Sequence, residues 1–149
     1  MKVEKTAVEV AGDKTIHDAA MTRLYTERVT AQTLALVDDH ETRMLAILPG
    51  NYSKEMPISP ATDAEIRRFT ETAYRHNAKS FIEFGNQAQV SSLDTLNKSF
   101  RDFFEPERPT RAIASEIVLT QPLYANKTLA EGWKGIGLNE RKRIEAAIR

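Results

Sequence analysis

The 149 residues include no cysteine, and this absence rules out disulfide bonds, thiolate nucleophiles and zinc sites built from cysteine. The redox compartment is left undetermined. No run of 18 apolar residues occurs, and the opening segment MKVEKTAVEVAGDK lacks the apolar core of a signal peptide. We therefore expect neither a membrane span nor a signal peptide, and we predict a soluble protein of the cytoplasm.

An excess of charge of either sign is also missing. The 21 basic residues balance the 21 acidic residues, so no net field attracts nucleic acid or an anionic membrane, whereas self-association becomes easier. Arginines and lysines are interleaved with acids, as in RRFTE and NERKR, a pattern typical of solvated helix faces. Nucleic-acid binding is therefore the least favoured of the functional classes considered.

Motifs that carry catalysis or bind cofactors are scarce. None of the three histidines, His17, His40 and His76, has another histidine three or four residues away, so no local metal motif is present. The acidic run at 38–41 favours a solvated turn. There is no G-x-S-x-G sequence, and GWKGIG at 132–137 lacks the order of a phosphate-binding loop. We predict no metal site and no cofactor.

The first half of the chain predicts a mixture of strands and helices. Alternating residues at 3–10 favour a strand, and apolar residues four apart at 15–25 favour a helix. Residues 28–48 predict a β-hairpin with 38–41 at its tip, although VTAQTLALV also suits a continuation of the helix. Residues 51–60 carry two prolines and predict a loop.

The second half continues the mixture. Thr62 and Glu65 form a capping-box pattern before apolar residues at helical spacing, which predicts a helix from Thr62. The other predicted elements are a strand at 81–84 that turns at Gly85, a helix from Asp94 that Pro106 and Pro109 stop, a buried strand at 112–120 and a final helix from Asn139.

These elements predict an α+β fold. We expect a single compact domain, residues 1–149, in which a mixed sheet with a β-hairpin packs against two to four helices. A three-layer α/β arrangement is the alternative, because the helices from Thr62 and Asp94 each lie between candidate strands. One domain is expected because a chain of this length, with 41% apolar residues, can build one core.

The stretch FFEPERPTRA, residues 103–112, places two arginines beside two prolines. Its aromatics and prolines are explained as the buried end and the stop of the preceding helix. Arg108 balances Glu105 and Glu107 in solvent, whereas Arg111 stands at the start of the next apolar run. A guanidinium is suited to bidentate binding of a carboxylate, so both arginines are binding candidates and Arg111 is the stronger one.

The run LDTLNKSFRDFFEPERPTRA resembles one segment of the Rid family of imine and enamine deaminases. In that family a helix ending in two aromatics precedes a proline-containing turn and an arginine that opens a strand. The resemblance implies that Arg111 would hold a substrate carboxylate in a cleft between subunits of a trimer. The family's P-Y-S-Q segment, glycine-bearing strand and acidic closing strand have no counterpart in this chain.

The leading hypothesis is a non-enzymatic protein-binding or regulatory domain, such as an inhibitor or adaptor, with self-association as one form of binding. This hypothesis depends on the absence of catalytic motifs and on the aromatic residues near the end of the sequence, since large aromatic side chains dominate binding hot spots. The predicted contact residues are Arg111, Trp133, Tyr124 and Arg108. The alternative is a small-molecule enzyme or ligand-binding protein with an anion site at Arg111, and a nucleic-acid-binding protein is the third hypothesis.

Overall fold

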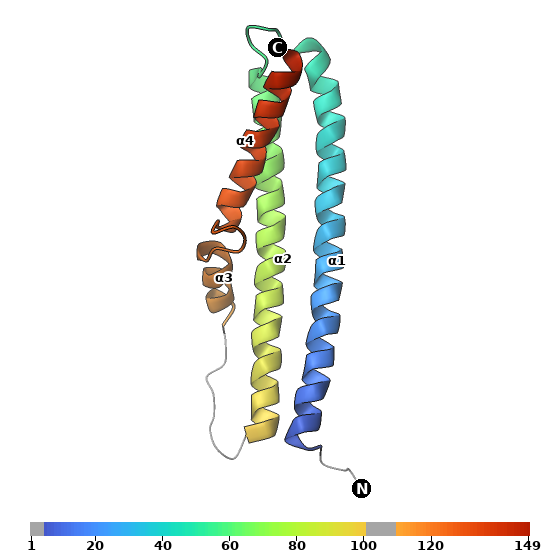
Figure 1. Cartoon of the computed structure of the whole chain (residues 1–149), viewed down its shortest axis with the longest axis vertical. Helices are drawn as coiled ribbons and strands as arrows, with labels where there is room; N and C mark the ends of the chain where they lie inside the picture. The colour runs from blue at the N-terminus through green and yellow to red at the C-terminus, as the bar shows by residue number, and fades with distance from the viewer. Residues whose placement is uncertain (1–4, 101–109) are drawn as a thin grey trace.

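A long antiparallel helical hairpin dominates the fold (Figure 1). The computed structural model describes residues 5–100 and 110–149. Helix α1 spans Ala7–Ile47, a 3-10 turn η1 spans Leu48–Gly50, and α2 spans Pro60–Phe100. Two shorter helices, α3 (Arg111–Thr120) and α4 (Leu129–Ile148), pack along α2. At about 1.5 Å per residue, each hairpin helix is roughly 60 Å long, so the molecule is a rod.

The predicted α+β fold is wrong, and so is its three-layer α/β alternative. The described residues contain four α-helices and no strand, apart from one isolated bridge between Tyr124 and Lys127. The predicted β-hairpin at 28–48 lies within α1, the predicted strand at 81–84 lies within α2, and the predicted strand at 112–120 is α3. Of the predicted strand at 3–10, residues 7–10 are helical.

The predicted helices are present but longer than expected. The helix predicted at 15–25 is one part of α1, and α2 runs through both Gly85 and Asp94 without a break. Thr62 does not cap α2, because the Ser59 hydroxyl, one residue before the helix, accepts the backbone N–H of Thr62 at 3.2 Å. GWKGIG is helical, since α4 begins ten residues before Asn139 at a Thr128–Glu131 capping box. The predicted stop at Pro106 and Pro109 lies outside the described residues.

Local interactions accommodate a threonine-rich sequence within such long helices. Several threonine hydroxyls donate to the carbonyl four residues earlier, as Thr26 does to Thr22 at 2.8 Å and Thr72 does to Arg68 at 2.7 Å. Ion pairs at i, i+4 spacing stabilise the exposed faces. They are Lys14–Asp18, Arg23–Glu27, Asp39–Arg43, Asp63–Arg67 and Glu71–Arg75.

A single face of α1 is turned toward α2 along the whole hairpin. Its least exposed positions recur after three or four residues, close to the period of a straight helix. They are Val10, Lys14, Asp18, Met21, Tyr25, Val29, Thr33, Leu36, His40, Met44 and Ile47. Two cross-helix contacts fix the register: the Tyr25 and Phe84 rings lie 5.0 Å apart, and Thr33 Oγ1 donates to Asn77 Oδ1 at 3.2 Å.

Ala114 and Val118 of α3 are buried, whereas the core of the two long helices lies at the closed end of the hairpin, where α4 is the third helix. Its buried apolar side chains there include Met44, Ile66, Phe69 and Ala73. In the open half, by contrast, no described side chain of α1 between residues 8 and 39 is fully buried, and none of α2 between 79 and 95 is. None of the described helices has the length and hydropathy needed to cross a membrane.

Gly137 sets how closely α4 approaches α2. A Cβ at this position would meet Thr70 Cγ2 at 3.1 Å and Ile66 Cγ2 at 3.4 Å, whereas a Cβ at Gly132 would meet nothing within 4 Å. The Thr70 side chain cannot easily turn away, because its hydroxyl donates to the carbonyls of Ile66 and Arg67 at 3.0 and 3.1 Å. The absence of a side chain at 137 therefore allows α4 to dock.

We predict that Gly137→Val lowers the free energy of unfolding by roughly 2 kcal/mol more than Gly132→Val does, because only the first creates an overpacked contact. Both substitutions make the same change in helix propensity, so their difference isolates the packing. Urea denaturation followed by the fluorescence of Trp133, the single tryptophan, measures it. Equal losses in the two variants would contradict this account of Gly137.

Candidate functional site

His40 joins three helices at the closed end. Its side chain is only 7% exposed; Nδ1 lies 3.0 Å from Glu65 Oε1 on α2, and Nε2 lies 2.6 Å from Glu140 Oε1 on α4. The ring stacks on Phe69, with centroids 4.3 Å apart. Each ring nitrogen thus faces a carboxylate oxygen of a different helix.

Further charges surround this joint. Arg68 donates to Glu65 Oε1 at 2.7 Å and to Glu65 Oε2 at 2.8 Å, and it also reaches Asp39 on α1 at 2.9 Å. Arg141 on α4 forms an ion pair with Asp63 on α2. The hydrogen bonds from Arg68, followed by the one from His40, hold the pKa of Glu65 below its ordinary value, although burial acts in the opposite direction.

This cluster has the properties of a structural joint. Both ring nitrogens of His40 are occupied by carboxylates, so neither is free to take a proton from a substrate. The nearby hydroxyls of Ser59 and Thr62 are buried and bond to each other at 3.0 Å. Within residues 5–100 and 110–149, no group of three or more histidine, aspartate or glutamate side chains is arranged to hold a metal ion.

The open half of the hairpin contains a groove between the two long helices. The groove has a volume of about 640 Å³ and lies between the N-terminal half of α1 and the C-terminal half of α2. Its apolar lining includes Val10, Met21, Phe84, Ala88 and Val90. Its charged lining includes Lys14 and Asp18, on the face of α1 turned toward α2, and Asp94 on α2. A surface that combines apolar and charged side chains in this way suits the binding of another protein.

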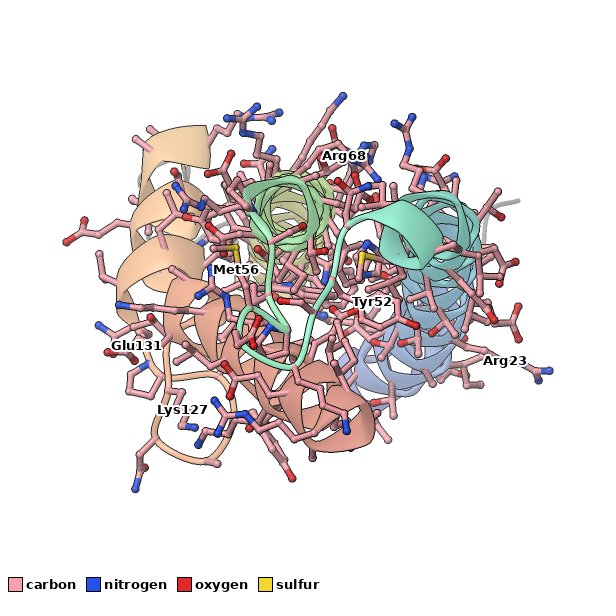
Figure 2. The ribbon with its side chains drawn as sticks, turned by 90° about the horizontal axis from the view of Figure 1, so that it is seen from above. Arg23, Tyr52, Met56, Arg68, Lys127 and Glu131 are labelled. Carbon is pink, nitrogen blue, oxygen red and sulfur yellow. The ribbon has the colours of Figure 1, made fainter. Side chains whose placement is uncertain are left out.

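The groove and the two short helices lie on different sides of the hairpin. Gly85 on α2 faces α3, where its Cβ position would lie 3.6 Å from Ala114 Cβ. Val90 and Asp94, five and nine residues further along α2, therefore point to the far side of that helix. Figure 2 shows that Arg68, in the closed half, also lies on the side of α2 away from α4. One side of the hairpin is thus uncovered by any described helix.

The contact residues predicted from the sequence do not form one site. Arg111 is the exposed first residue of α3 and opens a helix, not the expected strand. Trp133 is half-buried in α4, edge-on to Phe69 with the ring centroids 5.8 Å apart. Tyr124 is 85% exposed beside a tight turn at Ala125 and Asn126. No hydrogen bond, ion pair or aromatic contact links these three in the described parts, and Arg108 lies outside them.

The interpretation of the sequence also missed the residues that the fold brings together. The sequence predicts Glu65 at a helix cap and His40 at a hairpin tip, whereas in the structure His40 contacts both Glu65 and Glu140. The three-and-four spacing of Tyr25, Val29, Thr33, Leu36, His40 and Met44 was the available signal for one continuous helix. The groove gave no such signal, because its lining comes from segments about seventy residues apart.

No family model, curated protein or solved structure matches this chain. The class of protein is therefore defined by the fold and its surfaces: a rod whose described residues form helices, with a three-helix core at one end and a groove at the other.

We predict that Glu65→Gln lowers the free energy of unfolding by about 3 kcal/mol at neutral pH, because His40 and Arg68 lose a buried partner. A lowered pKa means that ionised Glu65 stabilises the fold above the ordinary glutamate pKa, near 4.3, and that this stabilisation is lost as the pH falls below it. The difference between wild type and variant should therefore narrow from pH 6 to pH 3.

Chemical denaturation at several pH values tests this prediction. Glu71→Gln is the matched control, since Glu71 is an exposed glutamate of the same helix, 3.9 Å from Arg75, and its loss should change stability by less than about 1 kcal/mol. A constant difference between wild type and Glu65→Gln over the acidic range would contradict the assigned role of Glu65.

Proposed function

We propose that this chain is a non-enzymatic protein-binding module, of the adaptor or regulatory kind, that binds through the groove in the open half of its hairpin. One observation carries the proposal: where no described side chain of α1 or α2 is fully buried, these two helices line a groove. Exposed apolar surface that is continuous and rimmed by charge is characteristic of interaction sites.

The surface area of the chain supports the same proposal. Its total accessible surface is 10938 Å², whereas a compact monomer of 16.8 kDa exposes about 7,600 Å². Apolar side chains of the open half contribute to this surface: Leu24 is 52% exposed and Val90 is 40% exposed. Covering such side chains releases about 25 cal/mol per Å² of apolar surface, which favours association with a partner.

The residues predicted from the sequence take different places in this proposal. Tyr124 and Arg111 are exposed and stay predicted contacts for a partner, outside the groove. Trp133 has a sufficient structural role in its packing against Phe69. The enzyme alternative depended on an arginine at the edge of a strand. Arg111 opens a helix, and no observation favours that alternative further.

A photo-crosslinking amino acid at position 90 tests the proposal in the cells that make the protein. We expect covalent adducts between this chain and another polypeptide, either a second copy or a different protein, identified by mass spectrometry. Position 75 is the matched control, because the Arg75 side chain is 78% exposed on the same helix but lies in the closed half. Adducts no more abundant at position 90 than at position 75 would overturn the proposal.

A further inference from the structure

One line of residues on α1 follows the edge of the groove and has a symmetric charge pattern. Asp13 and His17 line the groove, and Leu24 and Arg28 continue the same line at helical spacing. An acid begins the line and a base ends it. The two charges are equally far from the midpoint between Ala20 and Met21, as are His17 and Leu24.

Such a pattern is complementary to itself when the helix is reversed. In an antiparallel pair of identical helices, each residue lies opposite the residue at the same distance on the other side of the twofold axis. An axis at the midpoint of Ala20 and Met21 places Asp13 opposite Arg28 of the second copy, and His17 opposite its Leu24. In that register Asp13 of each copy forms an attractive pair with Arg28 of the other copy, so the interface contains this pair twice.

We infer that a second copy of this chain fills the groove, with the two α1 helices antiparallel about a twofold axis at Ala20 and Met21. This inference rests on the proposed function and names the partner for the same groove. Each α1 lies in the groove of the other copy, so one isologous interface covers both grooves. The balanced net charge of the chain adds no overall repulsion between copies.

The register of α2 agrees with this arrangement. Tyr25 lies against Phe84, and Thr33 lies against Asn77. Because the two helices are antiparallel, the numbers of two residues at the same level of the hairpin have nearly the same sum everywhere. By that rule Val90 lies at the level of Ala20, which is the level of the twofold axis. Val90, 40% exposed on the groove side, therefore faces the central part of the partner helix.

The remainder of the same side is unsuited to an apolar partner, which limits the interface to the open half. Toward the closed end this side carries Asp39, Arg43 and Arg68, joined by ion pairs of 2.9 and 3.0 Å. The contact from residue 10 to residue 31 is roughly 33 Å long. Contacts from both helices over that length suit an interface of the standard size, about 800 Å² per partner.

Arg28 is available for this contact. Its guanidinium lies 5.7 Å from the centre of the Tyr25 ring, and no carboxylate is within ion-pair distance of it in the described residues. Asp13 has an intramolecular partner in Lys5, but both side chains of that pair are more than half exposed, so the pair contributes little and can rearrange.

Charge reversal and complementation test the arrangement. We expect a dimer for wild type in sedimentation equilibrium, and a dimer dissociation constant raised about tenfold or more by Asp13→Arg or by Arg28→Asp, since each opposes like charges twice. An equimolar mixture of the two variants should form heterodimers of nearly wild-type affinity, because both charge pairs are then attractive. Arg23→Asp, the same charge change on another face of α1, should leave the dissociation constant unchanged.

Engineered cysteines locate the axis independently, because the chain has none of its own. Ala20→Cys should be joined into covalent dimers by a short bis-maleimide, whereas Thr30→Cys, on the other side of α1, should not. Circular dichroism confirms that each variant is folded. A wild-type chain that stays monomeric at 100 µM, an assumed working concentration well above most specific dissociation constants, would overturn the inference, as would a dimer insensitive to both charge reversals.

The outcomes separate this inference from the proposed function. Adducts from position 90 to a different protein, together with a monomeric chain, would leave the groove as a binding site and reject the second copy as its occupant. A dimer with the expected charge dependence, but without adducts at position 90, would reject the level assigned to Val90 and therefore this register.

Discussion

The contact of the His40 ring with Glu65 and Glu140 is the interaction on which the form of this molecule depends. Two helices that meet along one seam cannot enclose a core, so the hairpin needs a third helix wherever side chains are to be buried. The ion pairs of His40 and Arg141 attach α4 at the closed end, and Gly137 lets it approach closely. A core around Phe69 results. Where α4 is absent, the same two helices leave a groove.

The helices were only partly predictable from the sequence. The segment from Asp13 to Leu48 contains neither glycine nor proline, and this favours one uninterrupted helix. Its threonines and valines suggested strands instead, because β-branched residues are typical of sheets. In the folded chain, hydroxyls such as that of Thr26 bond to the carbonyl four residues earlier, so a strand is not needed to accommodate them. Lys14, Asp18 and His40 on the seam further weakened the apolar period.

The candidate sites were less predictable than the helices, for a physical reason. A local pattern can indicate that Glu65 lies near a helix start, but its contacts with His40 and Arg68 depend on the register between helices. The groove likewise joins Met21 to Val90, residues that only the hairpin brings together. The sequence shows that Tyr124 is an aromatic residue, but which residues surround it on the surface depends on the assembled fold.

Because the core and the groove lie at opposite ends, the two halves of the rod should differ in how readily they unfold locally. Protection of backbone amides from solvent exchange depends on local burial, so protection should be highest around Phe69 and Ala73 and decline along both long helices toward the open end. An occupant of the groove opposes fraying there, because fraying would expose the surface it covers. Whether the rod unfolds as one cooperative unit or as two is then decided by what lies against the open half.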